Sequence, residues 1–175
     1  EAKKVKDCLK KIFVKAEILT WNGKKKSKNT QSNARAARYK LLFQKSEKSR
    51  IRNILVGHHQ DDLFENFFIR MTRGSGLKGL ISLDKKTKIE DKNILRPLLD
   101  QKKSDLVFIS KFVFNFYVND PTNNIEKYQR IKIRKFLNLL QKNGLDNNKF
   151  SKTIENLKRS NYVVDFYVNR NITKN

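Results

Sequence analysis

The sequence predicts an α/β fold: a doubly wound, mainly parallel sheet with helices on both faces, followed by a helical segment. Two short apolar runs, at residues 16–21 and 54–56, suit buried strands, and a stretch rich in helix formers at residues 30–43 separates them. This alternation of strand, helix and strand is typical of parallel sheets, whose right-handed crossovers place helices on the faces. The length of 175 residues suits one domain with a substantial core.

Three further segments carry apolar residues at helical spacing. They are residues 2–13, 63–71 and 104–116. The aromatic residues Phe108 and Phe112 extend the apolar face of the last of these, so we expect them in the core rather than stacked on nucleic-acid bases. Another helix is expected after residue 150.

The stretch that leads up to the helix at 104–116 is expected to hold one short strand. Residues 84–93 are dominated by charged side chains, which predicts a loop. Ile94 and Leu95 then start a strand that ends before Pro97, because the residue that precedes a proline is sterically restricted. Further along, residues 141–149 are polar and contain glycine and asparagine, which marks the best linker candidate.

Composition points to a polyanionic partner. Forty Lys and Arg against seventeen Asp and Glu give a formal charge of +23 and a pI near 10.2, which favours RNA, with an anionic membrane surface as the lesser alternative. Part of this charge follows a general abundance of Lys, Asn and Ile. The single cysteine, Cys8, excludes a disulfide framework within one chain. No apolar stretch is long enough to span a bilayer, and the first residues lack the apolar centre of a secretory signal, so a reducing cytoplasm is expected.

The densest group of chemically able side chains follows the apolar run at residues 54–56, which Gly57 ends. They are His58, His59, Asp61, Asp62 and Glu65. Ligands of open parallel sheets bind beyond the carboxyl ends of the strands, so this turn is the expected site. Carboxylates suit Mg²⁺, and histidine suits proton transfer. Two alternatives remain: acids that only complement a helix dipole, and a transition-metal site built from His58, His59 and Asp62.

Two arginine-containing segments and a basic segment suit anions. The turn Arg73-Gly74-Ser75-Gly76 can bring backbone N–H groups close to a phosphate, although helices also commonly end in glycine. Arg35 and Arg38 are neighbours on one helix surface, where guanidinium groups can hold phosphate oxygens or simply face solvent. The basic residues of the last segment, which could face RNA, are Arg130, Lys132, Arg134 and Lys135.

Four motifs occur in one order: ARAARYKLL, LVGHHQDDLFENFFIRMTRGSGLKGL, LRPLL and NDPTNNIEKYQRIKIR. This series resembles that of the bacterial tRNA(Ile)-lysidine synthases, which belong to the PP-loop, or N-type, ATP pyrophosphatases. The resemblance covers nearly all of residues 1–137. The tRNA-thiolating enzymes of the same class share GHHxDDxxE but depend on paired cysteines, and this chain has only Cys8. Thiolation is therefore disfavoured.

The resemblance implies a ligase that uses ATP and Mg²⁺. It adenylates the C2 oxygen of the wobble cytidine in a tRNA(Ile) with a CAU anticodon and releases pyrophosphate, after which L-lysine attacks C2 and AMP leaves. It implies catalytic roles for Arg38, His58, Asp62, Glu65 and Arg73. It implies ATP or phosphate contacts for His59, Arg73, Gly74, Ser75 and Gly76. RNA contacts are expected from Arg35, Arg130, Lys132 and Arg134, and metal contacts from Asp61 and Asp62.

Two departures from the family pattern affect these expectations. The strand and SGGxDS motif with which the family begins, and which carries its main metal aspartate, do not occur in the 175 residues. We therefore expect a fragment, a split gene or a decayed gene, and a sheet that is incomplete at the N-terminus. Ile131 stands where the family usually has asparagine.

The expected organisation is a partial PP-loop catalytic domain at residues 1–137, a linker at 138–149 and the helical start of a C-terminal region at 150–175. Apolar surface left uncovered at both ends predicts either a missing remainder or self-association as a homodimer. Two other functions stay open. One is a catalytically inactive RNA-binding remnant of the family, and the other is a His/Asp metal-dependent hydrolase.

Overall fold

The computed structural model describes residues 1–23, 30–118 and 129–172. It is a mixed α/β structure that divides into two compact units. Unit 1 comprises residues 1–56, 86–97 and 104–118, and unit 2 comprises residues 57–85, 98–103 and 119–175.

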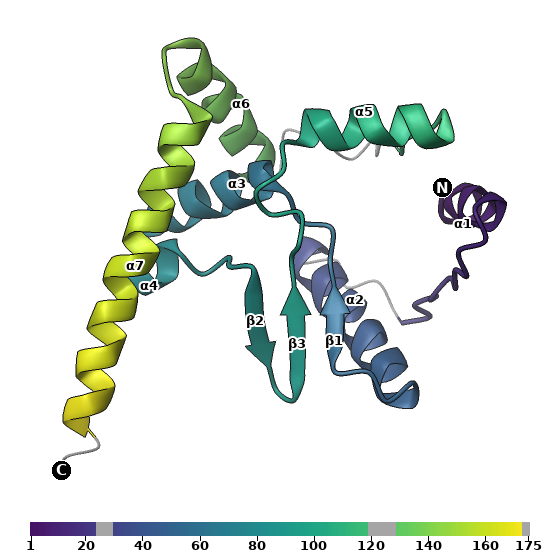
Figure 1. Ribbon diagram of the computed structural model, residues 1–175, viewed down its shortest axis with the longest axis horizontal. Coiled ribbons are helices and arrows are strands. Elements are labelled where there is room, and N and C mark those ends of the chain that lie inside the picture. The colour runs from purple at the N-terminus through teal and green to yellow at the C-terminus, as the bar shows by residue number, and fades with distance from the viewer. Residues whose placement is uncertain (24–29, 119–128, 173–175) are drawn as a thin grey trace. The chain divides into compact units, whose positions relative to one another are not determined.

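The sheet of unit 1 has three strands, which lie side by side in the order β1-β3-β2 (Figure 1). β1 (Asn53–Leu55) runs parallel to β3 (Lys92–Leu95), with Ile54 beside Ile94. β2 (Lys86–Ile89) is antiparallel to β3. The apolar centre of the sheet is Ile94, which is fully buried. The α/β class and the strand at residues 94–95 are thus confirmed. The strand predicted at residues 54–56 is also present, one residue earlier, whereas a doubly wound parallel sheet stays a prediction.

Two sequence predictions about strands are wrong. Residues 16–21 form no strand, because a strand requires a neighbouring ladder and the described sheet pairs β1 only with β3. Residues 84–93 contain β2 and the start of β3 instead of a loop. In β2 the lysines are exposed and alternate with half-buried Thr87 and Ile89, which is the period of a strand with one solvated face. A turn in which Glu90 adopts φ 55° joins the two strands.

The helices of unit 1 are α1 (Ala2–Lys11), α2 (Thr30–Lys48) and most of α5 (Lys103–Phe114). All three were expected, with bounds that differ by a few residues. The core position of the α5 aromatics is wrong: Phe108 and Phe112 are 69% and 83% exposed and stack on each other. Helical spacing places such side chains on one face, but within the described residues no element covers that face.

Unit 2 is helical and is built around α3 (Gln60–Met71). The short α4 (Leu77–Leu80), α6 (Gln129–Lys142) and the long α7 (Asn147–Ile172) complete it (Figure 1). The core joins residues of α3, α6, α7 and the segments between them: Leu63, Phe64, Phe67, Phe68, Ile69, Leu83, Leu99, Ile133, Leu137 and Ile154. The helix expected after residue 150 is therefore part of this core.

The aromatic ring of Phe150 links α7 to α3. Its centroid lies 4.8 Å from that of Phe64, 5.2 Å from that of Phe67 and 5.4 Å from that of Phe68. Such edge and tilted contacts add to the free energy of area burial. α7 begins because the carboxylate of Asp146 accepts a hydrogen bond from the Lys149 N–H at 2.8 Å, as an N-cap does.

No helix in the described ranges is both long enough and apolar enough to cross a membrane.

Candidate functional site

The predicted site residues between His58 and Glu65 lie at the start of α3, in unit 2. His59 has an extended backbone and precedes the first helical residue. The carboxylate of Asp62 accepts a hydrogen bond from the His59 backbone N–H at 3.0 Å, and it lies 3.4 Å from His59 Nε2. Both side chains are less than one-fifth exposed. The structure therefore brings His59 and Asp62 together. The pair caps the helix, and it is also of the kind that can transfer protons.

Asp61 differs from Asp62 in its surroundings. Its side chain is half-buried, and within the described part of the chain it has no hydrogen-bond or ion-pair partner. Asp61 lies near enough to Arg134 for its negative charge to favour the charged form of the guanidinium and so to raise the pKa of Arg134. Asp61 is thus the acid at this helix start that remains open to a cation.

Glu65 is held by Arg134. It is 2% exposed, and the Arg134 guanidinium reaches it from α6 through Nε to Oε1 and through Nη2 to Oε2, the latter at 3.4 Å. Burial raises the pKa of Glu65 from its usual value, against the opposing hydrogen bond and charge of Arg134. Burial alone would lower the pKa of Arg134, but the hydrogen bond and charge of Glu65 outweigh it and leave that pKa raised. Glu65 therefore faces an internal cation.

The glycine turn after α3 closes the helix. Gly74 has φ 68°, its N–H donates to the Met71 carbonyl at 3.0 Å, and the Ser75 N–H donates to the Arg70 carbonyl at 3.1 Å. These are the two hydrogen bonds of a helix end with a left-handed residue. The N–H groups of Gly74 and Ser75 are therefore engaged in the turn, and a phosphate here would be met by the exposed Arg73 side chain, the Ser75 hydroxyl or the backbone of Gly76.

The remaining predicted residues lie elsewhere. Arg35 and Arg38 are exposed on α2 in unit 1, and the Arg35 guanidinium lies over the Tyr39 ring at 5.3 Å. Arg130 and Lys132 are exposed on α6 in unit 2. Ile131 and Ile133, on either side of Lys132, are buried.

Sequence reasoning missed Gln60. This residue is 5% exposed; its N–H donates to the Gln101 carbonyl at 3.0 Å and its Nε2 to the Ser151 hydroxyl at 3.2 Å. Its Oε1 is buried and has no hydrogen-bond partner among the described residues. No sequence signal links Gln60 with Ser151, which lies 91 residues away.

Magnesium fits the acids at the start of α3 by chemistry, because it takes one or two carboxylates together with substrate phosphates and water. Asp61 and Asp62 would hold it. Within residues 1–23, 30–118 and 129–172, no group of three or more His, Cys, Asp and Glu side chains is close enough to hold a metal ion.

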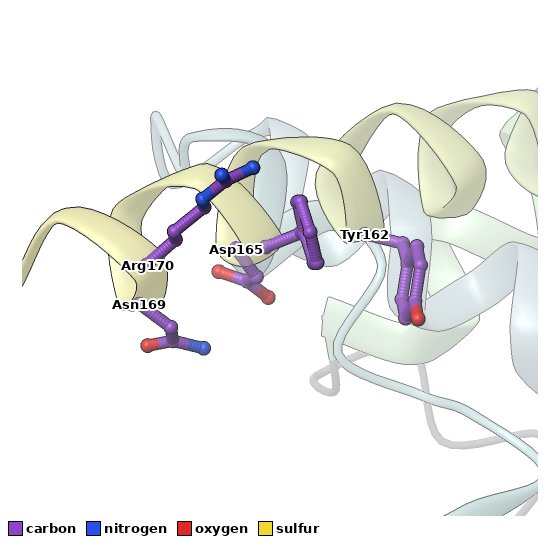
Figure 2. A pocket seen from close by; sticks show the side chains of 5 residues that line it. Tyr162, Asp165, Asn169 and Arg170 are labelled. Atoms are coloured by element: carbon purple, nitrogen blue, oxygen red, sulfur yellow. The ribbon is translucent and has the colours of Figure 1, made fainter. Parts of the chain in front are cut away.

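A shallow hollow occurs on α7, away from these residues in the same unit. Figure 2 shows that its lining side chains, among them Tyr162, Asp165 and Arg170, project from a single helix. It brings no second element to a ligand.

Comparison with known proteins identifies the class. The family model of the PP-loop domain matches residues 1–141. The chain therefore belongs to the PP-loop domain family, which supports the use of ATP.

Curated relatives are named tRNA(Ile)-lysidine synthase. The chain is 38% identical to that of Wolbachia sp. subsp. Brugia malayi over 130 residues, 74% of this chain and 30% of the relative. It is 38% identical to that of Orientia tsutsugamushi over 78% of this chain and 31% of the relative. It is 32% identical to that of Bradyrhizobium diazoefficiens over 94% of this chain and 46% of the relative. The chain thus spans less than half the length of these relatives.

Among solved structures, the U34-tRNA thiolase NcsA from Methanococcus maripaludis, with its [4Fe-4S] cluster, is similar with a TM-score of 0.61. The match covers 90% of this chain and 54% of that chain at 15% identity. At this identity the likeness supports a shared fold.

Proposed function

We propose that this chain is the PP-loop part of a tRNA(Ile)-lysidine synthase, which joins L-lysine to C2 of the wobble cytidine in a tRNA(Ile) with a CAU anticodon. The observation that supports it most is the ordered motif series, together with 38% identity to two relatives of that name. The site adds a chemical reason, because carboxylates and a histidine gather at the start of α3.

In this proposal the acids serve the cationic substrate. Asp62 lines the site for the lysine ammonium group and stays in place because His59 donates its backbone N–H to it, while Asp61 would contact Mg²⁺. His58 and His59 are suited to take a proton from an attacking amine. Glu65 would support the two histidines indirectly from the interior, since Arg134 holds its carboxylate.

The arginines serve the phosphates. ATP would supply the adenylyl group and Mg²⁺ would neutralise phosphate charge when bound. Arg73, exposed after α3, and Arg38, exposed on α2, carry guanidinium groups that pair with phosphate oxygens. Ser75 and Gly76 would add polar contacts beside Arg73. Arg35, Arg130 and Lys132 are exposed cations and would contact the tRNA backbone.

A second candidate is an RNA-binding member of the family without catalysis. The observation that favours it is the burial of Glu65 and its pairing with Arg134, which withhold one expected site carboxylate from a ligand.

The test incubates the chain with ATP, Mg²⁺, L-lysine and a tRNA(Ile) transcript, and measures AMP, pyrophosphate and lysidine. A form extended at the N-terminus by the upstream coding sequence is assayed in parallel. Lysine-dependent and tRNA-dependent AMP release by either form supports the synthase. Tight tRNA binding by both forms without AMP release would favour the second candidate.

A further inference from the structure

The turn that carries His59 and Asp62 is tied to two other segments of unit 2 through the residue between them. Gln60 donates its backbone N–H to the Gln101 carbonyl at 3.0 Å and its side-chain Nε2 to the Ser151 hydroxyl at 3.2 Å. Because Gln60 is 5% exposed, water cannot replace either partner freely.

Ser151 stands on an element that is itself firmly seated. The neighbouring Phe150 packs on the α3 rings of Phe64, Phe67 and Phe68, and Ile154 is 1% exposed. One turn further along α7, Lys158 donates to the carboxylate of Asp84 at 2.7 Å. The hydroxyl of Ser151 is therefore presented to Gln60 from a fixed backbone.

We propose that Ser151 is a positioning residue for the turn at residues 58–62: through Gln60 it fixes the register of His59 and Asp62 at the start of α3. Ser151 lies beyond residue 141, where the match to the PP-loop domain ends. In this proposal α7 therefore helps to hold the turn at residues 58–62 in place.

The hydrogen-bond inventory of Gln60 gives the physical reason. Its Oε1 is already buried without a partner among the described residues, so within this part of the chain the side-chain amide is bound by Ser151 alone. Removing the Ser151 hydroxyl leaves both polar atoms of a buried amide unpaired. The amide then turns toward water or other groups, and the residues on either side of it move with the turn.

Three variants test this. Ser151→Ala removes the hydroxyl, and alanine is a good helix former, so α7 is kept. Ser151→Thr retains a hydroxyl at the same position. Ser160→Ala removes an exposed hydroxyl from the same helix and is the matched control.

The first measurement is amide hydrogen exchange, which requires no substrate. In Ser151→Ala we expect the protection of the Gln60 and His59 amides to fall about tenfold, while the central amides of α3 change less than about threefold. Ser151→Thr should restore protection, and Ser160→Ala should match the unaltered protein. Unchanged protection at Gln60 and His59, or an equal loss along the whole of α3, overturns the proposal.

The second measurement rests on the proposed function and uses the lysidine assay. Ser151→Ala should raise the KM for lysine by about tenfold with a smaller change in kcat, and Ser151→Thr should recover the lower KM. Failure of the unaltered protein to release AMP would count against the proposed function alone, because hydrogen exchange still decides the role of Ser151.

Discussion

Arg134 on α6 holds Glu65 on α3 through two nitrogens, with Nη2 lying 3.4 Å from Oε2. The two residues are 69 positions apart in the chain, and Glu65 is 2% exposed. A carboxylate so deeply placed depends on its partner, since the charged form loses its hydration when buried.

The first prediction concerns this pair. Arg134→Met leaves a buried carboxylate without its partner and should lower the free energy of unfolding by about 2 to 4 kcal/mol. The double variant Glu65→Met/Arg134→Met removes both charges and should lie within about 1 kcal/mol of the unaltered protein. Urea unfolding measures the free energy of unfolding of the unaltered protein and of both variants. Lys142→Met, which removes an exposed charge from the same helix, is the control and should have little effect. A double variant that is less stable than Arg134→Met would contradict this account.

The second prediction is the pH dependence that Glu65 imposes. Burial raises its pKa above the ordinary value of 4.5, so between that value and the folded-state pKa the native protein holds a proton that the unfolded chain releases. The contribution of Glu65 to stability is therefore full below 4.5 and falls as the pH rises through the folded-state pKa. The difference in unfolding free energy between the unaltered protein and Glu65→Gln should shrink as the pH rises above 4.5.

Asp146 supplies a contrast of opposite sign for that experiment. The backbone hydrogen bond from Lys149 lowers the pKa of Asp146 below its ordinary value of 3.8. Its stabilisation is present above 3.8 and is lost as the pH falls through the folded-state pKa. The difference between the unaltered protein and Asp146→Ala should thus be constant over the range in which the Glu65 difference changes. A Glu65 difference that grew with pH would show that the sign is wrong.

The third prediction places α7 in the core. Ile154→Ala removes a side chain that is 1% exposed and should cost about 2 to 4 kcal/mol of unfolding free energy. Tyr162→Ala, on the same helix but 73% exposed, should cost less than about 0.5 kcal/mol. Equal effects in urea unfolding would mean that α7 does not pack as described.

The fourth prediction concerns the turn after α3. Gly74 has φ 68°, a conformation that side chains with a Cβ disfavour, so Gly74→Ala should cost about 1 kcal/mol. Gly57→Ala is the control: a Cβ there meets nothing within 4 Å, and the change should stay within about 0.5 kcal/mol. Thermal unfolding of both variants checks the ranking.

The fifth prediction separates charge from structure at the site. In Asp62→Asn the side-chain oxygen can still accept the His59 N–H, so the fold should persist, but the negative charge is gone. Lysidine formation should fall by about 100-fold, in the range of a lost acid–base or ionic contribution. Asp105→Asn, an exposed aspartate in the first turn of α5, should leave the rate unchanged. Full activity of Asp62→Asn would remove Asp62 from the catalytic roles.

The sequence predicted the helices best, because long runs of apolar residues at helical spacing specify one face. α3 is an example: Leu63, Phe64, Phe67 and Phe68 alone indicate a buried helix. Strands were harder, since a strand is stable only beside a partner. The run at residues 16–21 has the composition of a strand but pairs with no neighbouring strand among the described residues. β2 is a strand although its lysines give it the composition of a loop.

The part of the site that depends on local helix geometry was predictable from the sequence. His59 and Asp62 are three residues apart, so helix geometry alone brings them together. The pairings of Glu65 with Arg134 and of Gln60 with Ser151 depend on how distant helices pack, and a carboxylate reads the same in sequence whether it meets a ligand or an internal arginine.

The place of Phe150 and Ile154 in the α3 core has a practical consequence for anyone who expresses this protein. A chain trimmed at residue 141, where the family match stops, would strip α7 away and leave the rings of Phe64 and Phe67 facing water. Such a trimmed product should collect in inclusion bodies, whereas one that keeps the whole of α7 should be the better starting material for crystallisation.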